Sequence, residues 1–302
     1  MLQILHKTNI NFMGWKNVSF AVSAVMISLG LLALVQISRG KANMGIDFVG
    51  GTTVQLSFKD RLPIDEARTA LDKAGYQGFT LQDFSEGNKI LIRLREHEGV
   101  AEKVVETFKQ NFPSMPFEVE ATTEIGPTIG ADLQKDALLA IIFSVIAIII
   151  YIAIRFEFKF GVAAAIATMH DVFAVLAVFW LLNKEINLLI VTALLTLAGY
   201  SLTDTVVVFD RIRENLKKAK REPLPQLINA SINEVLSRTI ITSLTVVLVL
   251  VPLVIFGGEV LHDFSLSLLL GVIVGTYSSV FVASPILAVW HAKAGGQLIR
   301  KK

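Results

Sequence analysis

The sequence predicts a polytopic α-helical membrane protein with six transmembrane helices and one α+β domain inserted after the first helix. Two observations lead to this fold class. Apolar residues make up 53% of the 302 residues, and they are concentrated in blocks. A helix needs roughly 20 such residues to cross a bilayer. Between the first two blocks, the apolar residues are instead spaced as in strands and amphipathic helices.

Six apolar blocks have the length of a membrane-spanning helix. They cover residues 18–37, 136–154, 161–182, 187–209, 239–257 and 264–290. A cleaved signal peptide is the alternative for the first block, because Lys7 and Lys16 precede it. The block is, however, longer than a signal core of about 7–15 residues, and no small-residue cleavage site follows it. We therefore expect an uncleaved first span.

The distribution of Lys and Arg predicts that both termini are cytoplasmic. Outside residues 38–135, most of these residues lie in three segments, at residues 155–160, 210–238 and 291–302, whereas the turns on the opposite side contain only Lys184. Short cytoplasmic loops carry such an excess. The predicted parts are the N-terminus with the first span, an outer domain, a five-helix bundle with a basic loop at 210–238, and a cytoplasmic tail. These parts are residues 1–37, 38–135, 136–290 and 291–302.

The outer domain has the pattern of a small α+β sandwich. Alternating segments predict strands, and segments with helical spacing predict two helices between them. In chain order, the elements are expected at residues 52–58, 63–75, 79–84, 90–94, 100–112 and 117–125, with a turn at 85–88. This β-α-β-β-α-β order is ferredoxin-like. An edge strand of such a sheet can bind an extended peptide, and a rigid spacer or docking domain is an equal alternative.

Glycine-bearing segments flank the predicted domain at residues 45–52 and 126–130. The first contains Gly45, Asp47, Gly50 and Gly51. It lacks the Lys-Ser/Thr pair of a phosphate-binding loop and is not expected to lead into a helix. Since glycine tolerates backbone angles that other residues avoid, we expect a hinge or a strained connection at this point.

Polar residues within the fourth and fifth spans predict a gated ion pair. Four polar residues of the fourth span are four positions apart and form one stripe: Thr192, Thr196, Tyr200 and Asp204. Arg238 and Thr242 lie one turn apart at the start of the fifth span. Ionisable groups inside a membrane are costly and are usually kept for function. Protonation of Asp204 would release Arg238, although an anchor at the membrane interface is the alternative for Arg238 taken alone.

A second ionisable pair, His170 and Asp171, lies in the third span. Two interpretations of this pair remain open. It forms a hydrogen bond that packs helices together, or it takes part in proton transfer. Together with Tyr200, it is a candidate accessory proton relay. The sixth span has small residues at four-residue spacing, which predicts a close-packing face. These residues are Gly271, Gly275, Ser279 and Ala283.

The composition excludes several classes of site. The chain has no cysteine, so disulfides, thiol catalysis and Cys-ligated metals are excluded. Its five histidines have no spacing typical of a zinc site. The formal net charge of +2 gives no basic surface that would favour nucleic acid. We expect neither a metal nor a cofactor.

Four stretches of the sequence resemble motifs of the SecF family, the smaller half of the bacterial SecD–SecF translocation pair. The run GIDFVGGT at residues 45–52 resembles the family's glycine motif, which also occurs in SecD. Residues 199–215 resemble its fourth-span segment, and residues 237–243 and 256–258 resemble two parts of its fifth. The resemblance extends from about residue 15 to residue 291.

The resemblance implies a role that composition alone does not. SecF is similar in architecture to half of a resistance–nodulation–division type transporter, and SecD supplies the other half. The pair is implied to use the proton motive force in the bacterial inner membrane to assist preprotein translocation by SecYEG and SecA. Implied partners are SecD, SecYEG, YajC, YidC and unfolded preprotein on the periplasmic side. The proton-coupling positions fall on Asp204, Arg238 and Thr242, and Asp171 matches a His-Asp pair of the family. The chain would be a transport subunit rather than an enzyme, with protons as the coupling ion.

Three other functions remain as alternatives. The chain could be a half-subunit of a proton-driven small-molecule exporter, which shares the same plan. Asp171 and Asp204 could form an intramembrane aspartyl protease, because that chemistry needs two carboxylates in different protonation states. No Gly-x-Gly-Asp motif precedes either residue, however. A passive scaffold is the last alternative.

Overall fold

The computed structural model describes residues 8–84, 88–96, 99–218 and 222–293. The chain divides into two compact units. The first comprises Met1–Asn43, Ile141–Lys184 and Leu189–Lys302, and the second comprises Met44–Ala140 and Glu185–Leu188. Of the turn predicted at residues 85–88, only Asn88 is described, and residues 294–302 of the predicted tail also lie outside the described residues.

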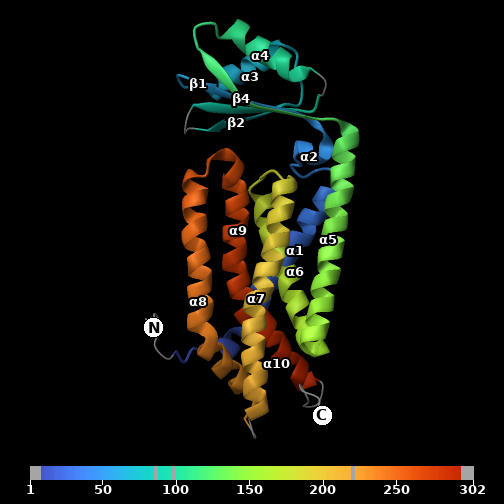
Figure 1. The fold of residues 1–302 in the computed structure, drawn as a ribbon, viewed down its shortest axis with the longest axis vertical. Helices are drawn as coiled ribbons and strands as arrows, with labels where there is room; N and C mark the ends of the chain where they lie inside the picture. The colour runs from blue at the N-terminus through green and yellow to red at the C-terminus, as the bar shows by residue number, and fades with distance from the viewer. Residues whose placement is uncertain (1–7, 85–87, 97–98, 219–221, 294–302) are drawn as a thin grey trace. The chain divides into compact units, whose positions relative to one another are not determined.

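Six stretches of the described chain are long and apolar enough to cross a membrane, which confirms the predicted number of spans. Each predicted block lies within or close to one helical stretch. The helices are η1 (Phe12–Trp15), α1 (Lys16–Ser38), α5 (Pro127–Arg155), α6 (Phe158–Leu181), α7 (Leu188–Lys218), α8 (Leu224–Phe256), α9 (Gly258–Ser278), the π-helical η2 (Ser279–Ala283) and α10 (Ser284–Lys293) (Figure 1).

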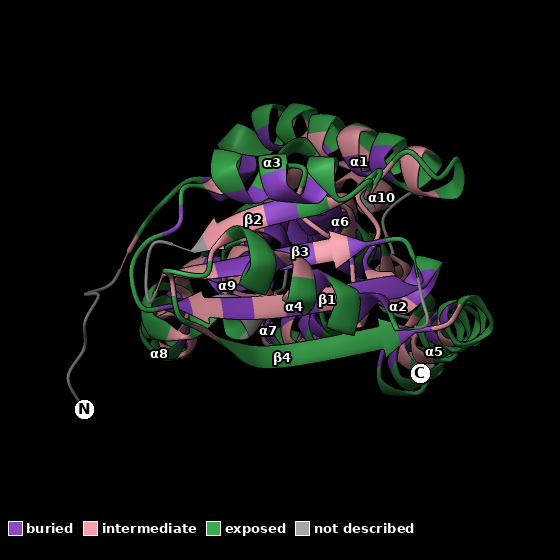
Figure 2. Ribbon diagram, turned by 90° about the horizontal axis from the view of Figure 1, so that it is seen from above, coloured by how far each residue is buried: buried purple, intermediate pink, exposed green. Residues whose placement is uncertain are grey.

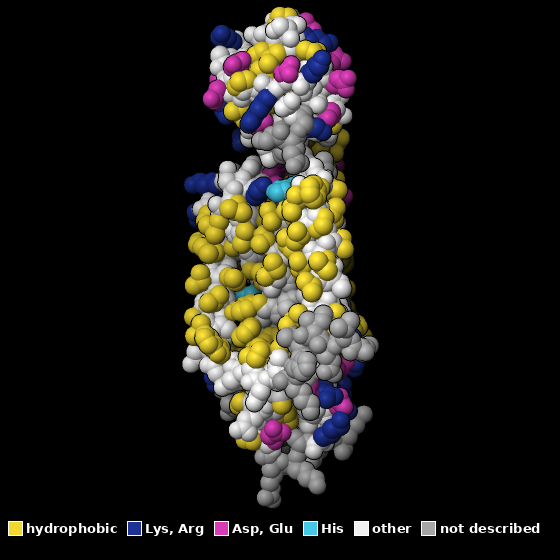
Figure 3. Space-filling view, turned by 90° about the vertical axis from the view of Figure 1, so that its left-hand side faces the viewer, with side chains coloured by type: hydrophobic (Ala, Val, Ile, Leu, Met, Phe, Trp, Pro, Cys, Tyr) yellow, Lys and Arg dark blue, Asp and Glu magenta, His cyan; other side chains and the backbone are white. Residues whose placement is uncertain are grey.

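The spans differ strongly in burial. α6 is the most buried of them, and α5 is the least. Large apolar side chains are exposed along α1, α5 and α8, including Leu32, Phe143 and Leu248. Hydrophobic side chains gather in a broad band over the helices on the face shown in Figure 3. Monomeric soluble proteins rarely expose such surfaces, so this band is the part of the chain that meets lipid or another membrane subunit.

Two helices extend well beyond the predicted spans. α7 continues to Lys218 and α8 begins at Leu224, so most of the loop predicted at residues 210–238 is helical. Hydropathy bounds only the apolar part of a helix, whereas Glu, Lys, Arg and Asn can continue it in water through side-chain pairs one turn apart. α5 likewise begins at Pro127 rather than at residue 136, because proline is favoured in the first turn of a helix.

The second unit contains the predicted β-α-β-β-α-β order. Its elements are the short helix α2 (Ile46–Val49), followed by β1 (Gly51–Phe58), α3 (Ile64–Lys73), β2 (Thr80–Phe84), β3 (Lys89–Leu94), α4 (Val100–Asn111) and β4 (Phe117–Ile125). The sheet order is β2-β3-β1-β4, and every neighbouring pair is antiparallel. This is the ferredoxin-like arrangement, in which each helix connects two strands that have a third strand between them.

The sheet of the second unit packs one face against both helices. α3 and α4 lie on the same side of the sheet (Figure 1). Val54, Leu56 and Ile92 of the central strands form the core with Leu71 of α3 and Phe108 of α4. β4 is an edge strand, and Figure 2 shows it exposed along nearly its whole length. The alternation of buried and partly exposed residues along β1 explains why the sequence predicted this strand.

Candidate functional site

Asp204 is a buried carboxylate on α7. Its residue is 9% exposed, and its Oδ2 atom finds no hydrogen-bond partner among the described residues. Two groups of α8 interact with it electrostatically, the Thr239 hydroxyl and the Arg238 guanidinium. Thr239 is buried, and its own Oγ1 has no hydrogen-bond partner in the same part of the chain. Asp204 thus interacts with two neighbouring residues of α8, of which the sequence predicted Arg238 but not Thr239.

The Thr242 hydroxyl forms its described hydrogen bonds within α8 and not with Asp204. Its hydroxyl donates to the carbonyl oxygens of Arg238 and Thr239, at 3.0 and 2.9 Å, within its own helix. Thr242 and Arg238 are exposed on this chain, as are Thr192 and Thr196 of the predicted stripe. The sequence reasoning missed Thr239, because it followed one face of α8 in four-residue steps from Arg238. Thr239 lies a residue further on and faces α7.

Asp171 is the centre of a buried polar cluster that joins three helices. Asp171 and His170 of α6, Ser201 of α7 and Ser278 of α9 are all inaccessible to solvent. His170 Nδ1 lies 2.9 Å from Asp171 Oδ1. The Asp171 Oδ2 atom accepts hydrogen bonds from the Ser201 hydroxyl and, at 2.8 Å, from the Ser278 hydroxyl. These bonds offset part of the cost of burying a carboxylate. Tyr200 is only partly buried, and none of the contacts described for Asp171 involves it.

Small residues of α9 bring Ser278 to this cluster. A Cβ atom added at Gly275 would lie 3.1 Å from Ser201 Cβ, and one at Gly271 would overlap Leu197 of α7. The predicted close-packing face therefore lets α9 approach α7. Ser278, one turn after Gly275, is followed directly by the π-helical segment η2. Single π-helical turns occur often at functional sites. Ser201 and Ser278 were missed because serine in a membrane helix gives no sign of which neighbour it will face.

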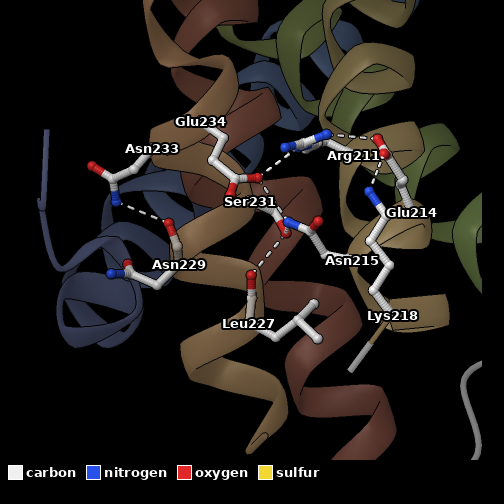
Figure 4. A network of polar contacts seen from close by, with 9 residues as sticks. All are labelled: Arg211, Glu214, Asn215, Lys218, Leu227, Asn229, Ser231, Asn233 and Glu234. Carbon is white, nitrogen blue, oxygen red and sulfur yellow. Dashed lines mark hydrogen bonds and ion pairs between the residues drawn. The ribbon is translucent and has the colours of Figure 1, made fainter. Parts of the chain in front are cut away.

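A network of polar side chains links the ends of α7 and α8 that lie beyond the apolar stretches (Figure 4). Arg211 Nε lies 2.5 Å from Glu234 Oε2, and Arg211 Nη1 lies 2.6 Å from Glu214 Oε2. Asn215 Nδ2 donates to Ser231 Oγ at 2.9 Å and to Glu234 Oε2 at 2.8 Å. Arg211 follows Asp204 by two turns of α7, and Glu234 precedes Arg238 by one turn of α8. The network therefore holds the two helices together next to Asp204.

The N-terminal segment is attached to the same part of α8. Asn233 exchanges two hydrogen bonds with the backbone of Ile10, each at 2.9 Å. The Phe12 amide donates to Asn229 Oδ1 at 2.7 Å, and the Phe12 ring packs edge-on against Phe281 of η2. Figure 4 shows Asn229 and Asn233 on one side of α8, and Ser231 and Glu234 directed toward α7.

The glycine motif of the second unit forms a compact turn. Gly45 precedes α2, and Asp47 lies in its first turn. Gly50 follows α2 and Gly51 begins β1, with positive φ angles of 75° and 135°. The sequence did not predict the helical turn inside the motif. Asp47 Oδ2 accepts a hydrogen bond from the Leu188 amide at 2.9 Å. Within the described ranges, no group of three or more His, Asp and Glu residues could hold a metal ion.

Comparison with known proteins gives consistent matches over most of the chain. The family profile described as protein export membrane protein SecD/SecF, C-terminal, matches residues 103–293, and that of the SecD/SecF GG motif matches residues 42–60. A protein translocase subunit SecF of Thermodesulfovibrio yellowstonii is 53% identical over 290 residues, covering 95% of this chain and 96% of the relative. A SecF of Vibrio alginolyticus is 39% identical over 95% of this chain and 91% of its own length.

Solved structures with the same fold include SecDF, a translocon-associated membrane protein from Thermus thermophilus. Its crystal structure has a TM-score of 0.84 at 34% identity, and a structure of SecDF in a super-membrane-facing form has a TM-score of 0.70. The matches cover 94% and 96% of this chain but only 39% and 40% of the SecDF chains. This chain therefore spans about two fifths of the SecDF polypeptides that it resembles.

Proposed function

The chain belongs to the SecF family of protein translocase subunits, and from this premise we propose that it couples proton movement across the membrane to protein export. It is a multi-pass inner-membrane protein. We propose that SecD is its partner and supplies the remaining part of a SecDF-like assembly. The exporter, protease and scaffold alternatives have no counterpart in the names of the relatives.

The observation that carries the proposal is the environment of Asp204. A buried carboxylate with one oxygen left without a hydrogen-bond partner among the described residues is costly unless a nearby charge compensates it, and the Arg238 guanidinium supplies that charge. The ionised carboxylate attracts Arg238, whereas the protonated one releases it. The Thr239 hydroxyl can donate to the first form and accept from the second. A proton that binds and leaves Asp204 thus changes the force between α7 and α8, without any cofactor.

The exposed polar side chains of α7 and α8 favour the presence of a partner protein in the membrane. Thr192, Thr196, Arg238 and Thr242 are exposed on this chain. Polar groups in a membrane normally face other helices rather than lipid. SecD is the partner that the family suggests for this face. The basic segments favour cytoplasmic termini, which would direct the sheet domain to the periplasm. There, the family resemblance suggests unfolded preprotein, with SecYEG, SecA, YajC and YidC as further partners.

Substitution of Asp204 by asparagine tests the proposal. Asparagine has nearly the same shape but does not exchange a proton, so the variant should assemble normally and lose the export that depends on a proton gradient. Export of a preprotein into membrane vesicles is measured with the gradient present and with it collapsed. Asp210→Asn is the matched control, because Asp210 lies on the same helix and pairs with Arg155 in an exposed position. Gradient-dependent export that survives in Asp204→Asn would contradict the proposal.

A further inference from the structure

We propose that residues 45–51 and Arg93 form a latch that grips residues 185–188, so that the segment leading into α7 and the four-stranded sheet move as one body. All of these residues belong to the second unit, and the chain continues from Leu188 directly into the rest of α7. The inference rests on the proposed function, because α7 carries Asp204. It assigns Asp47, Arg93 and Glu185 as positioning residues that transmit movement and do not carry protons.

The backbone of the glycine motif pairs with residues 185–188. The Gly45 amide donates to the Ile186 carbonyl at 2.9 Å, and Met44 and Ile186 form a parallel β-bridge. A Cβ atom added at Gly45 would lie 2.6 Å from Glu185 Oε1 and 2.8 Å from Asn187 Cβ. Only glycine therefore allows the two segments to approach this closely.

Asp47 caps α7 from a distant part of the chain. Leu188 is the first residue of α7, and its amide belongs to the first turn, where backbone donors have no partner within the helix. Asp47 Oδ2 accepts this donor at 2.9 Å across 141 positions of sequence. A carboxylate at this end also interacts favourably with the helix dipole. The cap thus binds the start of α7 to the glycine motif.

An ion pair fastens the same segment to the sheet. Arg93 Nη2, on the inner strand β3, lies 2.7 Å from Glu185 Oε2, with side-chain exposures of only 23% and 10%. By contrast, the Arg61–Asp83 pair of the same unit has exposures of 61% and 19%. Partial burial reduces the screening that makes exposed ion pairs weak. Arg93 also donates to Gln82 of β2 at 3.2 Å, which fixes its direction.

The motif is packed on its other side as well. A Cβ atom added at Gly130 of α5 would lie 3.0 Å from the Gly50 amide nitrogen and 3.2 Å from the Phe48 carbonyl oxygen. The two glycine-bearing segments that flank the domain in sequence thus meet each other. Glycine at these positions allows close packing. A motif that is packed against both residues 185–188 and α5 transmits displacement, whereas a hinge would absorb it.

Charge reversal tests the latch. Arg93→Glu and Glu185→Arg should each lose gradient-stimulated export while proton flux through the complex persists, and the double variant should regain the export. Arg61→Glu is the matched control and should change neither measurement. Asp204→Asn should lose both, so a failed latch and a failed proposed function give different results. Single reversals that leave gradient-stimulated export unchanged, or a folded double variant that does not regain it, would overturn the latch.

Hydrogen exchange tests the same contact independently of export. In the full chain, Asp47→Ala should speed exchange of the Leu188 amide about fivefold, which corresponds to the roughly 1 kcal/mol typical of a lost helix cap. Asp47→Asn keeps an acceptor and should have a smaller effect. Equal exchange in wild type and Asp47→Ala would overturn the cap.

A disulfide tests whether the latch stays closed during the cycle. The chain has no native cysteine, so Met44→Cys combined with Ile186→Cys can form one defined bond between the bridged positions. Export should be the same before and after oxidation. Export that stops on oxidation and returns on reduction would show that the segments must separate, which contradicts movement as one body.

Discussion

Replacing Ser278 by alanine removes one of the two hydroxyl donors that Asp171 Oδ2 accepts from neighbouring helices. The bond from Ser278 is 2.8 Å long, and both residues are inaccessible to solvent. Water therefore has no access to replace the lost donor without a rearrangement of α6, α7 and α9. We expect the variant to fold but to be less stable.

The magnitude follows from the nature of the acceptor. A hydrogen bond to a charged group contributes about 1.5–3 kcal/mol in soluble proteins. Interhelical hydrogen bonds in a membrane average only about 0.6 kcal/mol and reach about 1.7 kcal/mol. Because the acceptor here is a fully buried carboxylate, we expect a loss of about 1.5–1.7 kcal/mol, where the two ranges meet.

Unfolding of the chain in detergent micelles with a graded denaturant measures this loss. Ser279→Ala is the control, because Ser279 is equally buried but donates to the Thr276 carbonyl within its own helical stretch. A double-mutant cycle with Asp171→Asn isolates the Ser278–Asp171 term. Equal losses in Ser278→Ala and Ser279→Ala, or no coupling in the cycle, would refute the reasoning.

Two further predictions concern the helix ends and the sheet domain. Arg211→Ala removes the bonds to Glu234 and Glu214, but its side chain is 32% exposed, so the loss should stay below about 1 kcal/mol. Denaturant unfolding checks this, and a loss above about 2 kcal/mol would show that the network is far stronger than its exposure implies. Leu56→Ala empties a fully buried position of β1 and should cost about 2–5 kcal/mol. Faster hydrogen exchange of the β1 and β3 amides in the full chain checks it, and unchanged protection would contradict the assigned core.

Much of the fold could be predicted, because hydropathy and periodicity report directly on burial. The predicted strand at 117–125 coincides with β4, and the alternation in β1 placed its apolar residues against the helices. The ends of α7 and α8 could not be located in this way. Past Phe209 the residues become mostly charged, so the apolar signal stops, while the helix continues through pairs such as Glu214–Lys218.

The site was only partly predictable, because it depends on which helix faces meet. Asp204 was singled out as an ionisable group within an apolar block, and Arg238 as one at the start of the next, a signal that needs no tertiary structure. Thr239 and Ser278 gave no such signal, because each acts only through contact with another helix. Asp47 was named as part of the glycine motif, but its cap on α7, which joins residues 141 positions apart, could not be predicted. Glycine content marked the motif, but it does not distinguish a flexible hinge from a tightly packed turn.

Proton flux through the reconstituted SecD-bound complex tests the central claim most directly. Vesicles that contain the complex and a pH-sensitive dye are given a proton gradient, and acidification is followed for the wild type, Asp204→Asn and the Asp210→Asn control. The account predicts that Asp204→Asn abolishes the flux through the complex, while the wild type and the control conduct protons equally. Undiminished flux in a folded Asp204→Asn complex would contradict the assignment of Asp204 as the proton-binding group.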